Sequence, residues 1–345
     1  MSRPFPFADQ DAQLVAVAKD IKVLSHLEWP RSLRPRFLAS WRAGRPELPA
    51  PPPVQFKAPD VDVLARLSKP VADDPMARFI ARTAQSYLKA VRLLQAAGTP
   101  EFLTRSLEIY GGPRDRVLPN GMTSLEAAQH FIRDTDALNE SCHLAPESFC
   151  VSAEETARRM QGEIDRAFSD PPLPVVLDPG LVAKAAAGAE RVRLRSDANF
   201  NEADARQLVE HEALVHAATS RNGRSQPYLT CLSLGAPRTT ATQEGLATFA
   251  ELITNAMDLT RLRRLALRIL AVDKALTGAD FVDVFRFYLE AGYPEEEAYS
   301  STVRVFRGGD VRGGVAFTKD VVYLRGVLQT HAWFHVGLSA RRVQH

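Results

Sequence analysis

Apolar side chains recur at helical spacing along most of the chain. In residues 75–95, for example, Ile80, Tyr87, Val91 and Leu94 fall on one helix face. The same spacing predicts further helices near residues 64–67, 123–138, 152–168, 202–220, 241–258, 260–276, 279–291, 295–305 and 319–336. Two short apolar runs, residues 174–177 and 192–195, predict β-strands. The predicted fold class is therefore α+β, mainly helical, with a small sheet.

The first 55 residues have a different pattern. Seven prolines with arginines between them occupy residues 30–53, and proline interrupts both helix and sheet because it lacks a backbone N–H. We predict an irregular proline-rich N-terminal arm over residues 1–55, with a short helix within residues 12–27, followed by one domain over residues 56–345. Trp29 and Trp41 indicate that parts of the arm pack back on this domain.

Composition narrows the class of protein. The 43 basic and 41 acidic residues give a formal net charge of +2. This near balance gives no sign of the excess positive charge that is typical of nucleic-acid-binding proteins. The sequence contains no apolar run near the roughly 20 residues of a membrane helix, and its N-terminus lacks the apolar stretch of a signal peptide. The three cysteines lack the paired spacing of a disulfide framework or a zinc finger. We therefore expect a cytoplasmic protein that binds neither nucleic acid nor membrane.

One predicted helix carries polar groups on its buried face. Leu208 and Val209 form an apolar stripe that Glu212 and His216 continue, and His211 lies beside it. Burying such groups without partners costs several kcal/mol, and a divalent cation would satisfy them. The alternative is a pair of histidines that form hydrogen bonds within the core.

The spacing of the two histidines requires a distorted helix. In the usual zinc-peptidase motif two histidines stand at i and i+4, whereas His211 and His216 stand at i and i+5. On a regular α-helix this places them about 140° apart, too far for joint ligation. A π-bulge brings residues i and i+5 together, and such bulges are frequent at functional sites. We therefore predict a widened turn between His211 and His216.

A carboxylate completes the candidate site. Glu244 follows Thr240 and Gln243, which have the sequence of a capping box, so it is expected in the first turn of an interior helix. Gly245 beside it permits close approach of another backbone or of a ligand. Two histidines and one carboxylate leave one zinc coordination position for water. Glu212, adjacent to a ligand, is placed to take a proton from that water and pass it to the leaving group.

The same ligand set allows two other interpretations. Two histidines and a carboxylate also form the facial triad of non-haem iron enzymes, in which Glu212 would have no obvious role. A regulatory protein without peptidase activity could keep the metal for stability alone. In that case Glu212→Gln would leave function intact, whereas His211→Ala would destroy the fold. Glu251, Asp258 and Asp273 are expected to be ordinary helix charges.

Three segments together are similar to a known family. HEALVH, TQEGLAT and GGVAFTKDVVYLRG resemble the HExxxH tyrosine-carboxypeptidase (MATCAP-like) family of metallopeptidases. Its members include the microtubule-associated tyrosine carboxypeptidase of animals and bacterial proteins labelled flavohaemoglobin expression-modulating QEGLA-motif proteins. The resemblance extends over residues 56–338 and includes SLEIYGGPRD at residues 106–115.

The resemblance implies a zincin-like catalytic domain that releases the C-terminal residue of a peptide or protein, tyrosine in the animal enzyme. It implies one Zn²⁺ ion bound by His211, His216 and Glu244, with Glu212 as catalytic base. It also suggests that the FTKDVVYLRG segment helps to form the substrate site.

Basic residues around the glycine-rich segment at residues 308–314 are candidates for binding the substrate carboxylate, because arginine and lysine pair with carboxylates. Lys319 and Tyr323 are preferred because the resembling motif contains them, and Arg307 comes next. Tyr323 would be the oxyanion donor. The alternative is that these are solvated surface residues.

Overall fold

The fold is described from a computed structural model covering residues 5–118, 120–142, 151–181 and 183–340. It is mainly helical with one small sheet, as predicted. The α-helices are α1 (Ala8–Ala18), α2 (Val23–His26), α3 (Leu33–Arg42), α4 (Val61–Leu67), α5 (Pro75–Gln95), α6 (Glu101–Tyr110), α7 (Ser124–Cys142), α8 (Ala153–Ala167), α9 (Asp204–Leu208), α10 (Ala218–Arg224), α11 (Thr240–Ile253), α12 (Leu259–Leu276), α13 (Phe281–Glu290), α14 (Glu295–Phe306) and α15 (Val321–Ser339). A π-helix, η1 (Val209–Ala217), joins α9 to α10, and three 3₁₀ turns are η2 (Thr230–Ser233), η3 (Pro237–Thr239) and η4 (Thr318–Asp320).

The predicted helices of the second half are present within a few residues of their expected bounds, whereas α6 and β2 (Ala185–Ala187) were not predicted. The predicted cap of α8 is confirmed, because the Ser152 side chain accepts the Glu155 N–H. The predicted capping box of α11 is wrong. Its helix continues directly from η3, and no side chain caps it.

The N-terminal arm is more regular than its prolines suggested. The short helix predicted within residues 12–27 is present in part as α1, which begins earlier, and α2, whereas the prediction of an irregular segment is wrong for α3. Pro35 lies in the first turn of α3. A backbone N–H in this turn has no hydrogen-bond partner within the helix, so proline is tolerated there. Residues 45–60 contain neither helix nor strand.

The arm packs on the rest of the chain, as the two tryptophans indicated. Trp29 stacks on Phe281 with ring centroids 5.7 Å apart, and Trp41 contacts Phe285 at 5.0 Å. Leu14 of α1 belongs to the same buried apolar cluster as helix α5. The division of the chain at residue 55 stays a prediction.

The small sheet supports the π-helix. β3 (Val192–Arg195) is its central strand, parallel to β1 (Val175–Asp178) and antiparallel to β2. Val192 and Leu194 are buried in one apolar cluster with Val209 and Ala213 of η1. One face of η1 is therefore held by the sheet and α8, and it also packs against α11.

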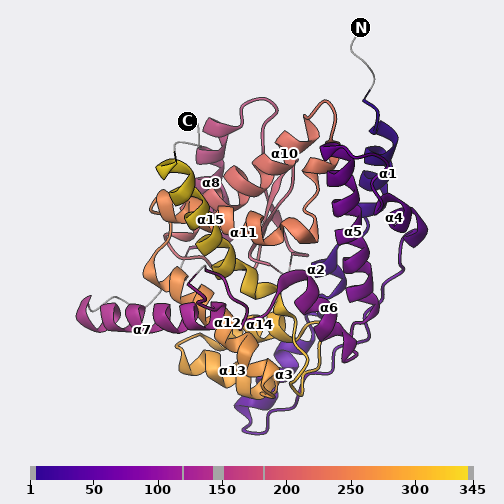
Figure 1. Cartoon of the computed structure of the whole chain (residues 1–345). Coiled ribbons are helices and arrows are strands. Elements are labelled where there is room, and N and C mark those ends of the chain that lie inside the picture. The colour runs from indigo at the N-terminus through magenta and orange to yellow at the C-terminus, as the bar shows by residue number, and fades with distance from the viewer. Residues whose placement is uncertain (1–4, 119, 143–150, 182, 341–345) are drawn as a thin grey trace.

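Helices α11 and α15 cross in close contact (Figure 1). A Cβ atom on Gly245 would lie 2.3 Å from the carbonyl carbon of Gly326, and one on Gly326 would lie 2.2 Å from the Ala241 oxygen. Only glycine fits at either position. The backbone approach expected at Gly245 is thus confirmed, and it places Glu244 beside the start of α15.

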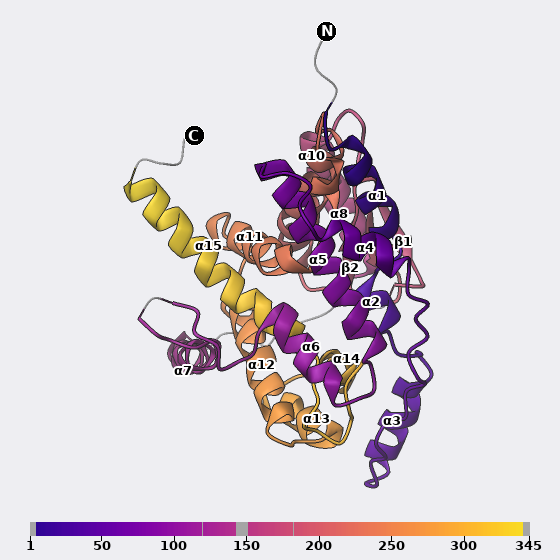
Figure 2. The same cartoon turned by 45° about the vertical axis from the view of Figure 1, so that its right-hand side comes forward.

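The C-terminal half of α15 extends away from the body of the molecule (Figure 2). Trp333 and Val336 on this half are 62% and 63% exposed. Among the described residues, every helix is too short or too polar to cross a bilayer.

Candidate metal centre

The two histidines of the HEALVH segment lie together because the helix widens there. Residues Val209–Ala217 form a π-helix, in which i and i+5 lie on one side. The rings of His211 and His216 are 4.8 Å apart, with an interplanar angle of 84°. The predicted widened turn is confirmed. The extra residue therefore brings the two rings to one side of the helix.

Glu244 in the first turns of α11 faces both rings. Its Oε2 lies 3.3 Å from Nε2 of His211 and 3.7 Å from Nε2 of His216. One donor atom from each of the three residues lies within 4.8 Å of the others. The structure therefore brings together all three predicted ligands.

The donor set fits a divalent cation. Glu244 Oε2 is buried and forms no hydrogen bond, although buried carboxylate oxygens are normally satisfied. Nε2 of each histidine and this oxygen are ligand atoms that zinc accepts. A cation among them would satisfy the buried oxygen.

Charge in the cluster also favours a cation. Burial raises the pKa of Glu244, but Lys319 and the two histidines outweigh it and hold that pKa well below its usual range. Burial lowers the pKa of His211, but Glu244 and Glu251 outweigh it and raise that pKa to about 10. The carboxylates thus attract positive charge to this position.

Glu251 is a part of the site that sequence reasoning missed. The prediction that it is an ordinary helix charge is wrong, because its side chain is fully buried and its Oε1 lies 2.6 Å from Nδ1 of His211. Arg261 holds the same carboxylate through bonds of 3.0 and 3.1 Å. Burial raises the pKa of Glu251, but Arg261 and His211 outweigh it and lower that pKa to about 2. Because Nδ1 is held by this ionised acceptor, Nε2 is the nitrogen of His211 that faces the cluster and is left to bind a cation in place of its proton.

The sequence did contain a signal for Glu251. It follows Glu244 by seven residues, which is about two helical turns, so the two carboxylates share a face of α11. By contrast, Asp258 caps α12 by accepting the Arg261 N–H, and Asp273 pairs with Arg114 at 2.9 Å. These two are the helix charges that were expected.

Substitution of Glu251 by glutamine should weaken zinc binding by about 10- to 100-fold, the usual effect of losing a carboxylate behind a histidine ligand. Competition with a chromophoric chelator measures this dissociation constant. Glu210→Gln is the matched control. The carboxylate of Glu210 lies near Arg206 and Glu163, whereas the partner of His211 Nδ1 is Glu251. Equal zinc affinity in Glu251→Gln and wild type would contradict the orienting role.

Of the predicted substrate residues, Lys319 contacts the cluster directly, and Tyr323 contacts Lys319. Lys319 is buried, and its Nζ donates to Glu244 Oε1 at 2.8 Å and to the Tyr323 hydroxyl at 3.3 Å. Arg307 lies over the Phe317 ring at 5.2 Å, and its buried Nε has no hydrogen-bond partner. The Lys319 ammonium group is therefore engaged in an ion pair with Glu244, whereas Arg307 has an unused hydrogen-bond donor at Nε.

Tyr110, from the SLEIYGGPRD segment, is a second residue without a predicted role. Its buried ring packs edge-on against Phe317 with centroids 5.4 Å apart. Burial raises its pKa to about 12, while Lys319 and Arg307 act in the opposite direction. Their electrostatic effect places this tyrosine near the site.

Glu212 is half-buried beside His211. Its negative charge contributes to the raised pKa of His211. Within the described part of the chain its carboxylate makes no hydrogen bond or ion pair, so it is not committed to a structural partner.

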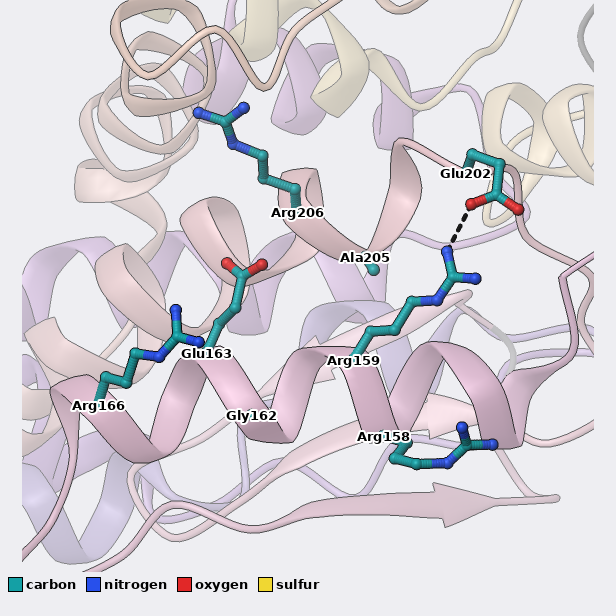
Figure 3. A pocket seen from close by; sticks show the side chains of 8 residues that line it. All are labelled: Arg158, Arg159, Gly162, Glu163, Arg166, Glu202, Ala205 and Arg206. Carbon is teal, nitrogen blue, oxygen red and sulfur yellow. Dashed lines mark hydrogen bonds and ion pairs between the residues drawn. The ribbon is translucent and has the colours of Figure 1, made fainter.

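A surface hollow of about 550 Å³ lies between α8 and α9 (Figure 3), and none of the three candidate ligands lines it. It is rich in arginine, but Arg159 pairs with Glu155 and Glu202, and Arg158 with Glu155. The acidic residues offset much of its positive charge, and we assign it no function.

The fold and this cluster define a mainly helical α+β protein with a candidate metal site of two histidines and one carboxylate. Residues 35–345 match the family model described as microtubule-associated tyrosine carboxypeptidase, and the chain therefore belongs to this family. Membership indicates a carboxypeptidase-type peptidase that acts on a peptide or protein. No curated protein matches the sequence significantly.

Proposed function

We propose that this chain is a zinc-dependent carboxypeptidase with a zincin-like site that releases the C-terminal residue of a peptide or protein. His211, His216 and Glu244 would hold one Zn²⁺ ion. The observation that supports this most strongly is the buried Glu244 Oε2, which lacks a hydrogen bond and lies 3.3 and 3.7 Å from the two histidine nitrogens. Tyrosine is the released residue that the family description names.

Zinc bound here would polarise the scissile carbonyl and make water a better nucleophile at neutral pH. Glu212 would accept the proton from that water and deliver it to the leaving amine. The Tyr323 hydroxyl, oriented by Lys319 at 3.3 Å, would donate to the oxygen on which negative charge develops.

The remaining basic residues would select a free C-terminus. Arg307 has unpaired donors and would bind the terminal carboxylate. Lys319 would contribute positive charge while it keeps Glu244 and Tyr323 in place. Together these residues would distinguish a carboxypeptidase from an enzyme that cleaves internal bonds.

Metal analysis combined with peptide hydrolysis tests the proposal. We expect about one zinc per chain, release of the last residue from peptides with a free C-terminus, and loss of release on chelation. Peptides with an amidated C-terminus should be poor substrates. Iron at full occupancy, or no release from any peptide, would favour the iron enzyme or the regulatory protein instead.

A further inference from the structure

The helices that carry the three candidate ligands are joined by one connector. His211 and His216 lie on η1, which continues into α10, and Glu244 lies on α11. The connector, residues 225–239, leads from the end of α10 to the start of α11 and contains η2 and η3. Its path therefore affects where Glu244 lies relative to the two histidines.

The connector is in close contact with the elements on either side of it. Gly223 of α10 is buried, and a Cβ atom there would lie 2.3 Å from the backbone nitrogen of Ser233 in η2. Near its other end the Arg238 N–H donates to Ser86 Oγ of α5 at 2.8 Å, and α11 follows directly from η3. A displacement of η2 would be transmitted to α10, because closely packed backbones have little room to move separately.

The turn η2 is capped by a residue from a distant part of the chain. Its own N-cap residue, Leu229, makes no capping hydrogen bond, and the first N–H groups of a helical turn have no partner within it. Asp11 of α1 provides the acceptors. Its Oδ1 accepts the Cys231 N–H at 2.9 Å, and its Oδ2 accepts the Thr230 N–H at 2.9 Å and also the Thr230 hydroxyl.

Burial makes this contact specific. Asp11 is 3% exposed and has no ion pair within the described part of the chain. A buried carboxylate without hydrogen bonds is strongly unfavourable, so α1 is stable only where η2 supplies these donors. Phe5 also contacts Tyr228 of the connector, with ring centroids 5.3 Å apart, and Leu14 is buried in the apolar cluster that contains Cys231. Helix α1 thus holds η2 by directional hydrogen bonds and by apolar packing.

The position of the connector matters because zinc requires closely placed donors. Zinc bonds to histidine nitrogen and carboxylate oxygen are about 2.0–2.2 Å long, so two donors of a tetrahedral site lie about 3.4 Å apart. Glu244 Oε2 lies 3.3 and 3.7 Å from Nε2 of the two histidines. A functional site has to be held within about 0.5 Å of its working geometry, which a displaced connector would not do.

We propose that α1 is an intramolecular clamp, in which Asp11 acts as a positioning residue. By holding η2 it fixes η1 relative to α11 and thereby sets the zinc affinity of the three candidate ligands. The proposal rests on the proposed zinc-dependent function and adds a contribution from a segment outside the matched family region, residues 35–345. The hydrogen bonds of Asp11 are to η2, so its effect on the metal centre is indirect.

Zinc affinity of full-length variants tests the clamp. We expect Asp11→Ala to weaken zinc binding by about 3- to 30-fold, the usual size of coupling between separated sites. Asp11→Asn should weaken it less, because the amide keeps one oxygen acceptor. Competition with a chromophoric chelator, well below the unfolding temperature, measures both dissociation constants. Asp9→Ala is the matched control, because Asp9 is an exposed carboxylate on the same helix, and it should bind zinc as wild type does.

A second variant separates positioning from stability. Phe37 is buried in a different apolar cluster and packs on Phe281 with ring centroids 4.9 Å apart. Phe37→Ala should therefore lower the Tm and leave the zinc dissociation constant at its wild-type value. If Asp11→Ala also lowered the Tm with unchanged zinc affinity, its role would be structural and the proposal would be overturned.

Hydrogen exchange of the metal-free protein distinguishes failure of the clamp from failure of the proposed function. Asp11→Ala should speed exchange by at least about tenfold at the amides of residues 209–217 and 225–246, through local opening, while α13 stays unchanged. That pattern in a chain that binds no zinc would support the clamp and refute the zinc-dependent function. Faster exchange confined to residues 225–234 would make Asp11 a local cap and overturn the proposal. Zinc-dependent hydrolysis with equal zinc affinity in Asp11→Ala and wild type would support the function and refute the clamp.

Discussion

Glutamine in place of Glu212 is expected to reduce kcat by about 10²- to 10⁴-fold, the usual contribution of a general base, while the protein retains its zinc. Glutamine has nearly the same shape but cannot accept the proton from water at neutral pH. Glu212 is outside the ligand cluster, so metal content should stay near wild type. Steady-state hydrolysis and metal analysis on the same preparation measure both quantities.

The matched control for this substitution is Glu210→Gln on the same π-helix, because Glu210 and Glu212 lie on either side of His211. Glu210→Gln should retain wild-type kcat. Full activity in Glu212→Gln would exclude the proposed base. Loss of zinc together with activity would show instead that Glu212 supports metal binding.

The candidate metal ligands could be predicted from the sequence because they break a local pattern. Glu212 and His216 occupy positions where the helix face is otherwise apolar, and Glu244 lies in an apolar helix. A charge on a buried face needs a partner, and that rule needs no knowledge of the fold. The five-residue spacing of the histidines then required a π-helix, which is present.

Glu251 could not be assigned in the same way. A charged residue in a helix is usually solvated, and sequence alone does not show which one is buried. Glu251 is buried because Arg261, from α12, reaches it. Its place beside His211 therefore depends on a tertiary contact between two helices.

In the N-terminal arm the prediction failed because the rule that proline interrupts helices was applied to every proline. Proline disrupts helix interiors but is tolerated in a first turn, where Pro35 lies. At the α11–α15 crossing, Gly245 predicted a close approach, but its partner Gly326 could be identified only from the packed helices. That contact joins the QEGLA segment to the KDVVYLRG segment and thereby places Lys319 on Glu244.

Substitution of one candidate zinc ligand is expected to have a large effect on zinc binding and on thermal stability. His216→Ala is expected to weaken zinc binding by roughly 10²- to 10³-fold, since structural zinc sites of several ligands provide about 10–16 kcal/mol in total. Zinc at about a thousand times its dissociation constant would stabilise the wild-type fold by about 4 kcal/mol. Thermal unfolding with zinc and with chelator should therefore give clearly different Tm values for wild type.

The same difference in Tm should fall to about a third or less in His216→Ala, because zinc at that concentration is then only about one to ten times its dissociation constant. His335→Ala is the control, since His335 is exposed on α15, stacked on His331 at 6.4 Å. It should retain the full zinc-dependent shift. A shift that survives in His216→Ala and disappears in His335→Ala would place the cation on α15. That result would remove the basis for a catalytic role of the π-helix, because Glu212 would then have no metal beside it.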